Sequence, residues 1–361
     1  MAVIHPWLEP LWAQWMALGG RLPHALLIAG APGLGKRDLA EALAARLLCD
    51  VPRTDGQACG HCLPCQWRAS GNHPDLHRLS PENREAQSSA DETEGGESGS
   101  SEHKAKSTQS ATQIVIGQVR AVQEALFVTA HRGGKRVVIV DPAEAMNPFT
   151  ANALLKLLEE PPDGCVFMLI SSAPRRLLPT IRSRCQQWHV PRPGVDALRR
   201  WQAGQEREEH IEASLLALCG GIPLAARRLS AQGGGVLFER FISDLDVDGI
   251  DPLRLAAQWE TWLKKDKTVL ATGFSLIMLV EWMQRWVSDL TALRLGGRVR
   301  YFPAQAERLA ILSAGSSAVS LIGCYNEFIS IRRVATHPLN LRLFLEDMLM
   351  RYARVFKGVR P

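Results

Sequence analysis

The stretch that decides the fold spans residues 25–43 and reads ALLIAGAPGLGKRDLAEAL. Its first five residues form an apolar run, which predicts a buried strand, and the Ala- and Leu-rich segment 38–48 predicts a helix. Between them lies a glycine-rich turn that ends in lysine, the sequence context of a phosphate-binding loop. In such a loop, backbone N–H groups and the helix N-terminus face an anion. The residues that would bind the phosphates are Gly30, Gly33, Gly35 and Lys36.

The residue after the lysine departs from this pattern. A phosphate-binding loop places Ser or Thr there, whose hydroxyl coordinates magnesium. This chain has Arg37 instead, and a guanidinium cannot coordinate a cation. A turn that merely links a strand to a helix is the alternative interpretation, and the full spacing favours the phosphate loop. Whether the loop still binds ATP or ADP is left open by the sequence.

Length and composition set the general class. The chain has 361 residues, which suggests two or three domains, and its 46% hydrophobic and 22% charged residues are ordinary for a globular protein. The net charge of +5 permits contact with nucleic acid without requiring it. No apolar run reaches the roughly 18 residues of a membrane span, and segment 1–15 lacks the basic apolar leader of a signal peptide. We therefore expect a cytoplasmic protein with no membrane partner.

Strand and helix patterns alternate through the first half of the chain. Apolar runs at 136–141 and 165–171 predict two further buried strands, with a helix between them at 147–160. Segment 73–79 is a plausible additional strand. This alternation predicts a doubly wound parallel sheet. Beyond the hinge-like segment 191–194, the patterns are helical.

Segment 81–111 differs sharply in composition. Glu, Ser, Gly, Thr and Gln dominate it and large apolar residues are absent. Such a segment cannot bury enough surface to offset the entropy of ordering its backbone, so we expect a disordered insertion. Its acidic residues permit an interaction role, but a solvated loop is the simpler interpretation.

The strand predicted at 136–141 ends in Asp141, where a P-loop ATPase places the acid that helps to hold magnesium. An active ATPase of this type usually carries a glutamate next, which orients the attacking water. Here the next residue is Pro142, which has no acid or base. Two parts needed for hydrolysis are therefore absent, namely the hydroxyl at position 37 and the acid at position 142.

Eight cysteines in an intracellular-looking chain indicate metal ligands or free thiols rather than disulfides. Segment 59–65 reads CGHCLPC, and Cys49 precedes it by ten residues. Two successive CxxC spacings and a fourth thiol favour a structural zinc site over a redox pair. The predicted ligands are Cys49, Cys59, Cys62 and Cys65, and His61 could replace Cys49.

Two arginines, Arg182 and Arg184, lie in the segment PTIRSRC at 179–185. Taken alone, arginines near a helix end usually serve only to solvate the surface. In an ATPase-type domain, an arginine here could reach the γ-phosphate of a neighbouring subunit and stabilise the transition state.

The motifs follow one another in a distinctive order: the phosphate loop, the cysteine cluster, His-Pro-Asp at 73–75, NALLKLLEEPP at 152–162 and Ser-Arg-Cys at 183–185. This order resembles the AAA+ subunits of the bacterial DNA polymerase III clamp loader. The resemblance covers residues 7–229 well, and the C-terminal third agrees only in length and helical character.

The resemblance implies three domains. The first, 1–190, would be an α/β AAA+ domain with a doubly wound parallel sheet, a zinc module at 49–65 and the insertion at 81–111. A small helical lid would follow at 191–235, and an all-α collar, which mediates oligomerisation, at 236–361.

Two kinds of clamp-loader subunit share these motifs, an ATP-hydrolysing motor and a non-hydrolysing subunit. The motor would have Ser or Thr at 37, an acid at 142 and an arginine where this chain has Leu224. All three departures fall on the hydrolysis machinery, so the non-hydrolysing subunit is the better match, and an active gamma/tau-type motor is the alternative.

The resemblance also implies partners and a role. The partners would be the gamma/tau and delta subunits, the sliding clamp and, through the complex, primed DNA. The chain would be part of a DNA-directed DNA polymerase, a nucleotidyltransferase holoenzyme, without itself being a polymerase or an active ATPase. Its role would be to offer Arg184 to a neighbouring motor, while Asp141 and the phosphate loop form a vestigial nucleotide site.

Overall fold

The computed structural model describes residues 4–81, 113–127, 134–204, 211–245, 249–335, 337 and 340–356. The chain divides into two compact units, Met1–Trp201 and Gln202–Pro361, and each is described by itself. The disordered insertion expected at 81–111 lies outside the described residues except for Pro81.

Unit 1 is built on a five-stranded parallel sheet with the strand order β2-β3-β4-β1-β5. Every residue of β1, β3 and β4 is buried, as expected for central strands covered on both faces. The prediction of a parallel sheet is therefore confirmed. The strands are β1 Ala25–Ala29, β2 Leu76–Leu79, β3 Arg136–Val140, β4 Cys165–Ser171 and β5 Gln186–His189.

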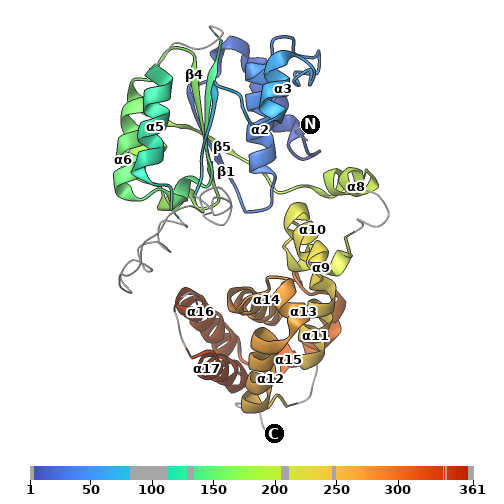
Figure 1. Cartoon of the computed structure of the whole chain (residues 1–361). Coiled ribbons are helices and arrows are strands. Elements are labelled where there is room, and N and C mark those ends of the chain that lie inside the picture. Colours follow the sequence, from blue (N-terminus) through green and yellow to red (C-terminus); the bar gives the residue numbers. More distant parts are fainter. Residues whose placement is uncertain are drawn as a thin grey trace. The chain divides into compact units, whose positions relative to one another are not determined.

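Helices cover both faces of this sheet, with α5 and α6 on one side and α2 and α3 on the other (Figure 1). Apolar side chains of α5 and α6 pack with those of the sheet into one buried cluster. The helices of unit 1 are α1 Glu9–Leu18, α2 Lys36–Leu48, α3 Leu63–Ala69, α5 Ile116–Phe127, α6 Pro148–Glu159, α7 Pro179–Arg184 and α8 Val195–Ala203, with short 3₁₀ helices η1 Gly19–Arg21, η3 Ala143–Ala145 and η4 Pro174–Arg176.

Local sequence sets both ends of α6. The Asn147 side chain accepts a hydrogen bond from the N–H of Thr150 at 2.9 Å, which caps the helix, and Pro148 at the first position has no N–H to satisfy. The helix ends at Glu159, just before the proline pair at 161–162, because proline cannot continue a helix.

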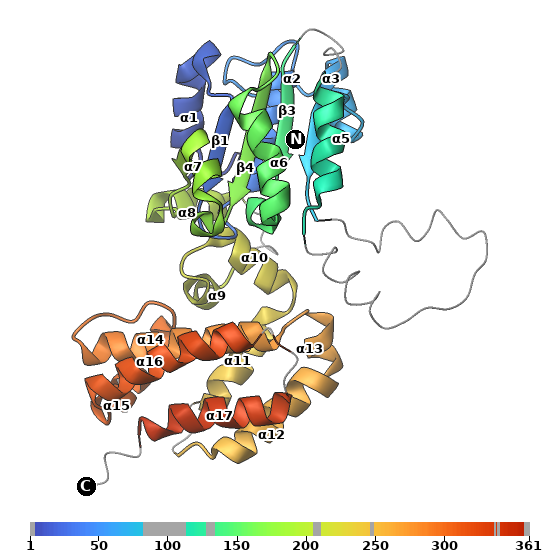
Figure 2. The same ribbon diagram turned by 90° about the vertical axis from the view of Figure 1, so that its left-hand side faces the viewer.

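The described residues of unit 2 form helices and no strand, which confirms the helical prediction for this part of the chain. Helix α14 packs along α16, and α12 packs along α17 (Figure 2). The helices are α9 Ala213–Leu218, α10 Pro223–Ala231, α11 Gly234–Leu245, α12 Pro252–Lys265, α13 Lys267–Ala271, α14 Leu276–Arg294, α15 Ala306–Ala314, α16 Ala318–Val334 and α17 Leu341–Arg354, with η6 Pro303–Gln305. The division into lid and collar stays a prediction.

A buried carboxylate fixes one loop of unit 2. Asp289 on α14 is 1% exposed, and its carboxylate accepts the backbone N–H groups of Arg300, Tyr301 and Phe302 at 2.8–3.0 Å. These bonds satisfy the buried N–H of Phe302 and two partly buried N–H groups beside it. They also hold Phe302 against the aromatic core.

Among the described residues, no single helix has both the length and the apolar character of a membrane span. One pair, Pro303–Ala314 with Ala318–Val334, meets those criteria only when joined, and its two parts bend by 117°.

Candidate functional site

The glycine-rich loop that the sequence predicts to bind phosphate, called the phosphate loop below, lies between β1 and α2. Gly33 and Gly35 have φ angles of 83° and 77°, a left-handed backbone that glycine adopts without steric cost. At Gly35 space is also limiting, since a Cβ there would lie 2.6 Å from Cδ2 of His5. The loop therefore requires glycine at this position for two independent reasons.

Lys36, the first residue of α2, turns back into this loop. Its Nζ donates to the carbonyl oxygens of Gly30 and Ala31, both at 2.8 Å, and to Oγ of Ser172 at 3.0 Å. The residue is only 6% exposed. Burial lowers the pKa of Lys36, and the nearby charges of Glu144 and Asp141 oppose this shift in part.

Arg37 and Asp141 form an ion pair through Nε and Oδ2. Asp141 directly follows β3, so the aspartate expected to hold magnesium is paired with the arginine that replaces the other magnesium ligand. The Asp141 side chain is 16% exposed and that of Arg37 is 68% exposed. Glu144 does not pair with Arg37. Its Oε1 instead accepts a hydrogen bond from the N–H of Ser172 at 2.9 Å.

The segment before α1 contacts the loop, which the sequence analysis missed. The Nε1 of Trp7 donates to the carbonyl of Leu34 at 2.9 Å, and His5 Nε2 lies 3.0 Å from Oδ2 of Asp38. The His5 and Trp7 rings stack with centroids 4.8 Å apart. No signal in the local sequence of this segment pointed to the loop.

The structure brings together the four cysteines predicted as zinc ligands, and all four Sγ atoms lie within 4.8 Å of one another. Cys49 and Cys62 are 3.8 Å apart, and Cys59 and Cys65 are 4.0 Å apart. Four thiolates around one tetrahedral Zn²⁺, with Zn–S near 2.3 Å, would stand about 3.8 Å apart. The cluster therefore fits zinc.

Backbone geometry favours a thiolate within this cluster. A hydrogen bond from the backbone of His61 is the main reason that the pKa of Cys59 is lowered to about 6, and the N–H of Cys62 also donates to this sulfur at 3.3 Å. The His61 ring is not in the cluster, since its Nδ1 lies 3.1 Å from the carbonyl of Cys59. The structure thus places Cys49, rather than His61, with the other three cysteines.

Arg184 is the last residue of α7, and its side chain is 36% exposed. Its Nη2 lies 2.5 Å from Oε1 of Glu159, and its Nη1 donates to the carbonyl of Thr180 at 3.0 Å. The sequence analysis identified Arg184 but not the glutamate that holds it.

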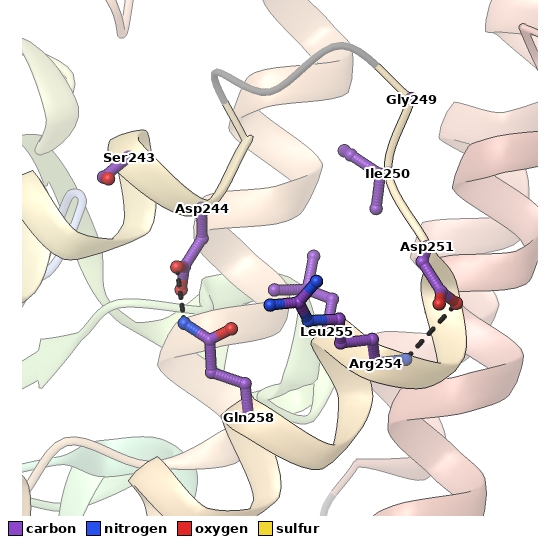
Figure 3. A pocket seen from close by; sticks show the side chains of 8 residues that line it. All are labelled: Ser243, Asp244, Gly249, Ile250, Asp251, Arg254, Leu255 and Gln258. Carbon is purple, nitrogen blue, oxygen red and sulfur yellow. Dashed lines mark hydrogen bonds between the residues drawn. The ribbon is translucent and has the colours of Figure 1, made fainter.

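Unit 2 contains a pocket of about 440 Å³ lined by Ser243, Asp244, Gly249, Ile250, Asp251, Arg254, Leu255 and Gln258 (Figure 3). Its two carboxylates have structural roles. Asp244 accepts hydrogen bonds from Gln258 and from the indole of Trp259, both at 2.7 Å, and Asp251 caps α12. We assign no chemistry to this pocket.

These features define a class of protein. A parallel sheet whose strand β1 leads through a glycine-rich loop into a helix headed by lysine, with an aspartate after β3, is a P-loop α/β domain. The model of the family described as "DNA polymerase III, delta subunit" matches residues 12–193, half of the chain. The chain belongs to this family.

Individual relatives carry a more specific name. The DNA polymerase III subunit delta' of Pseudomonas aeruginosa is 46% identical over 237 residues, which cover 64% of this chain and 63% of that protein. The Escherichia coli subunit delta' is 36% identical over 66% of this chain and 61% of its own length. The chain thus spans less than two thirds of either relative. The subunit delta' of Buchnera aphidicola is 27% identical over 96% of this chain and 98% of that protein.

Proposed function

We propose that this chain is the delta-prime subunit of the DNA polymerase III clamp loader, a non-hydrolysing AAA+ subunit that helps to load the sliding clamp onto primed DNA. Its family and the names of its relatives support this role. The observation that carries the non-hydrolysing part is the ion pair between Arg37 and Asp141.

This ion pair bears on hydrolysis through magnesium. In P-loop ATPases a Ser or Thr hydroxyl and an aspartate hold the metal that neutralises charge developing on the phosphates. Here Arg37 replaces the hydroxyl and also neutralises the aspartate. Pro142 supplies no carboxylate to orient water. An active gamma/tau-type motor, the alternative function, would need all three parts.

The proposed contribution to the complex is Arg184. A guanidinium is always charged and can donate two parallel hydrogen bonds to phosphate oxygens, which suits it to act in trans on a neighbouring active site. Its side chain is partly exposed and held at a helix end by Glu159, so it is ordered without being buried. Arg182, on the same short helix, is the matched control.

We further propose that Cys49, Cys59, Cys62 and Cys65 bind one structural zinc ion. Zinc would connect the end of α2 to α3, and its positive charge would offset the repulsion between four closely spaced thiolates.

The proposed assembly follows the three-domain organisation, with an AAA+ domain at 1–190, a lid at 191–235 and a collar at 236–361. The partners would be the delta and gamma/tau subunits, the sliding clamp and primed DNA. The chain would act in the cytoplasm as part of the DNA-directed DNA polymerase holoenzyme. Any DNA contact would be made with phosphates.

Reconstitution tests this function. The full chain is mixed with purified delta and gamma/tau subunits, the clamp and primed DNA, and clamp loading is measured with and without the chain. We expect clamp loading to require the chain. ATP hydrolysis by the chain alone is measured as well, and we expect Lys36→Ala to leave it at the same background level as in the unmutated chain. Loading that proceeds equally without the chain would exclude the delta-prime role, and turnover lost with Lys36→Ala would favour the motor.

A further inference from the structure

The buried ammonium of Lys36 has no negatively charged group among its hydrogen-bond partners in the described residues, as a purely structural lysine would need. Burying a charged group is costly unless it is paired with an opposite charge. The three direct partners of the Lys36 ammonium are neutral oxygens, two backbone carbonyls and the Ser172 hydroxyl. Asp141 and Glu144 are near enough to act on it, but neither is bonded to it. An anion in the loop would supply the missing counter-charge.

The loop around this lysine keeps the form of an anion site. Its glycines retain the left-handed backbone at positions 33 and 35, and Trp7 and His5 hold it from outside. A loop that only linked β1 to α2 would have no need of a lysine buried at this depth.

Magnesium, in contrast, has lost both protein ligands that this fold provides. The hydroxyl position holds Arg37, and the Asp141 carboxylate is engaged by that arginine. The pairing uses Nε of Arg37, and among the described residues no partner is present for its two Nη groups. Because the side chain is 68% exposed, these Nη groups can turn toward an anion while Nε stays on Asp141.

We propose that the phosphate loop binds the diphosphate group of a nucleotide without magnesium, with Arg37 supplying the positive charge that an active P-loop site takes from the metal. The loop N–H groups contact the phosphates, and Lys36 exchanges one of its three present hydrogen bonds for a phosphate oxygen. The Arg37 Nη groups donate to a phosphate oxygen as well. The bound nucleotide is therefore not positioned for hydrolysis. This binding is a property of the isolated chain, whereas clamp loading is measured in the complex, so either can fail alone.

The test is isothermal titration of the full-length, zinc-loaded chain with ADP and with inorganic pyrophosphate. The buffer is freed of divalent cations by chelating resin, because a soluble chelator would attack the cysteine cluster. Each titration is repeated after magnesium chloride is added. We expect ADP to bind in metal-free buffer, with a Kd that magnesium does not lower. Binding of pyrophosphate as well would show that the phosphates alone are sufficient.

Two variants separate the roles of the basic residues. Lys36→Ala should weaken ADP binding by about ten- to a hundredfold, the usual effect of losing a charge-assisted hydrogen bond. Arg37→Thr, which restores the hydroxyl and frees Asp141, should weaken metal-free binding to a similar degree and recover it when magnesium is added. Thermal melting of the ligand-free variants checks that both fold.

Two results would overturn the proposal. One is the absence of ADP binding to the unmutated chain in either buffer. The other is tighter binding by the unmutated chain in magnesium, since that would mean the metal still finds its ligands.

Discussion

Glu159, the last residue of α6, anchors Arg184, the last residue of α7, with Oε1 2.5 Å from Nη2. A carboxylate at a helix C-terminus is opposed by the helix dipole, so Glu159 gains nothing from its own helix. Its stabilising interaction is the ion pair with Arg184, which holds the arginine side chain in one orientation at the surface. If Arg184 acts in trans, Glu159 is a positioning residue for it.

Arg184→Ala should fold and assemble normally yet lower clamp loading and DNA-stimulated ATPase activity of the reconstituted complex. An arginine finger is worth about 10³–10⁵ in rate at the site that it serves. Arg184 would serve only the one motor site beside this chain. The loss in the whole complex should therefore be partial, unless hydrolysis at the several motor sites is coupled. Arg182→Ala is the matched control and should matter less. Unchanged loading with Arg184→Ala would leave the chain as a scaffold only.

Glu159→Gln should lower the same ATPase activity by less than Arg184→Ala does, because the arginine remains but is held less firmly. The double variant should be no worse than Arg184→Ala alone, since coupled residues give non-additive effects. Glu160→Gln, at the adjacent exposed position, is the control. Additive losses would show that Glu159 acts independently of Arg184.

The isolated chain should show no measurable ATP hydrolysis, because magnesium and the attacking water both lack their protein ligands. Phosphate release is measured with and without primed DNA, beside Lys36→Ala as the background. Loss of either part in an active site costs orders of magnitude in rate. Steady turnover that Lys36→Ala abolishes would contradict this expectation.

The protein purified without added metal should contain one zinc ion per chain, as determined by elemental analysis. Cys49→Ser should reduce zinc affinity by more than about a hundredfold, because removing a direct ligand exceeds the 10–100-fold effect of outer-shell changes. His61→Ala should leave affinity nearly unchanged, since its ring lies outside the cluster. Removing the metal with a chelator should lower the melting temperature. A stably folded, metal-free chain would disprove the site.

Asp289→Ala should destabilise unit 2 by about 1–3 kcal/mol, because the buried N–H of Phe302 loses its acceptor together with the partly buried N–H groups of Arg300 and Tyr301. Asp347→Ala is a suitable control, since the exposed side chain of Asp347 pairs with Arg351 at the surface. Losing this pair should cost less than about 1 kcal/mol. Urea denaturation followed by tryptophan fluorescence measures both, and each variant is compared with the unmutated chain, because both units contain buried tryptophans. Equal effects of the two substitutions would contradict the assigned role of Asp289.

Features written in local sequence could be predicted without the structure. Strands β1, β3 and β4 are continuous apolar runs because both faces of a central parallel strand are covered. The phosphate loop and the cysteine cluster could be predicted from residue spacing. In the loop, the spacing of the glycines positions the backbone N–H groups, and in the cluster, the CxxC spacing brings the cysteine side chains close together.

Strand β5 was not found from the sequence. It reads QQWH at 186–189, and three of its four residues are exposed. An edge strand pairs through its backbone with one neighbour, here β1, and leaves little apolar pattern to detect. Its place in the sheet depends on the strand beside it, which the local sequence does not specify.

The candidate site shows the same division. The sequence by itself determined that Lys36, Arg37 and Asp141 are present and that the hydroxyl and acid of an active ATPase are not. Only the tertiary structure decided that Arg37 pairs with Asp141, 104 positions away, that Glu159 holds Arg184, and that Trp7 contacts the phosphate loop. Backbone spacing fixes which groups are near in the chain, whereas packing of the sheet and helices decides which distant charges meet.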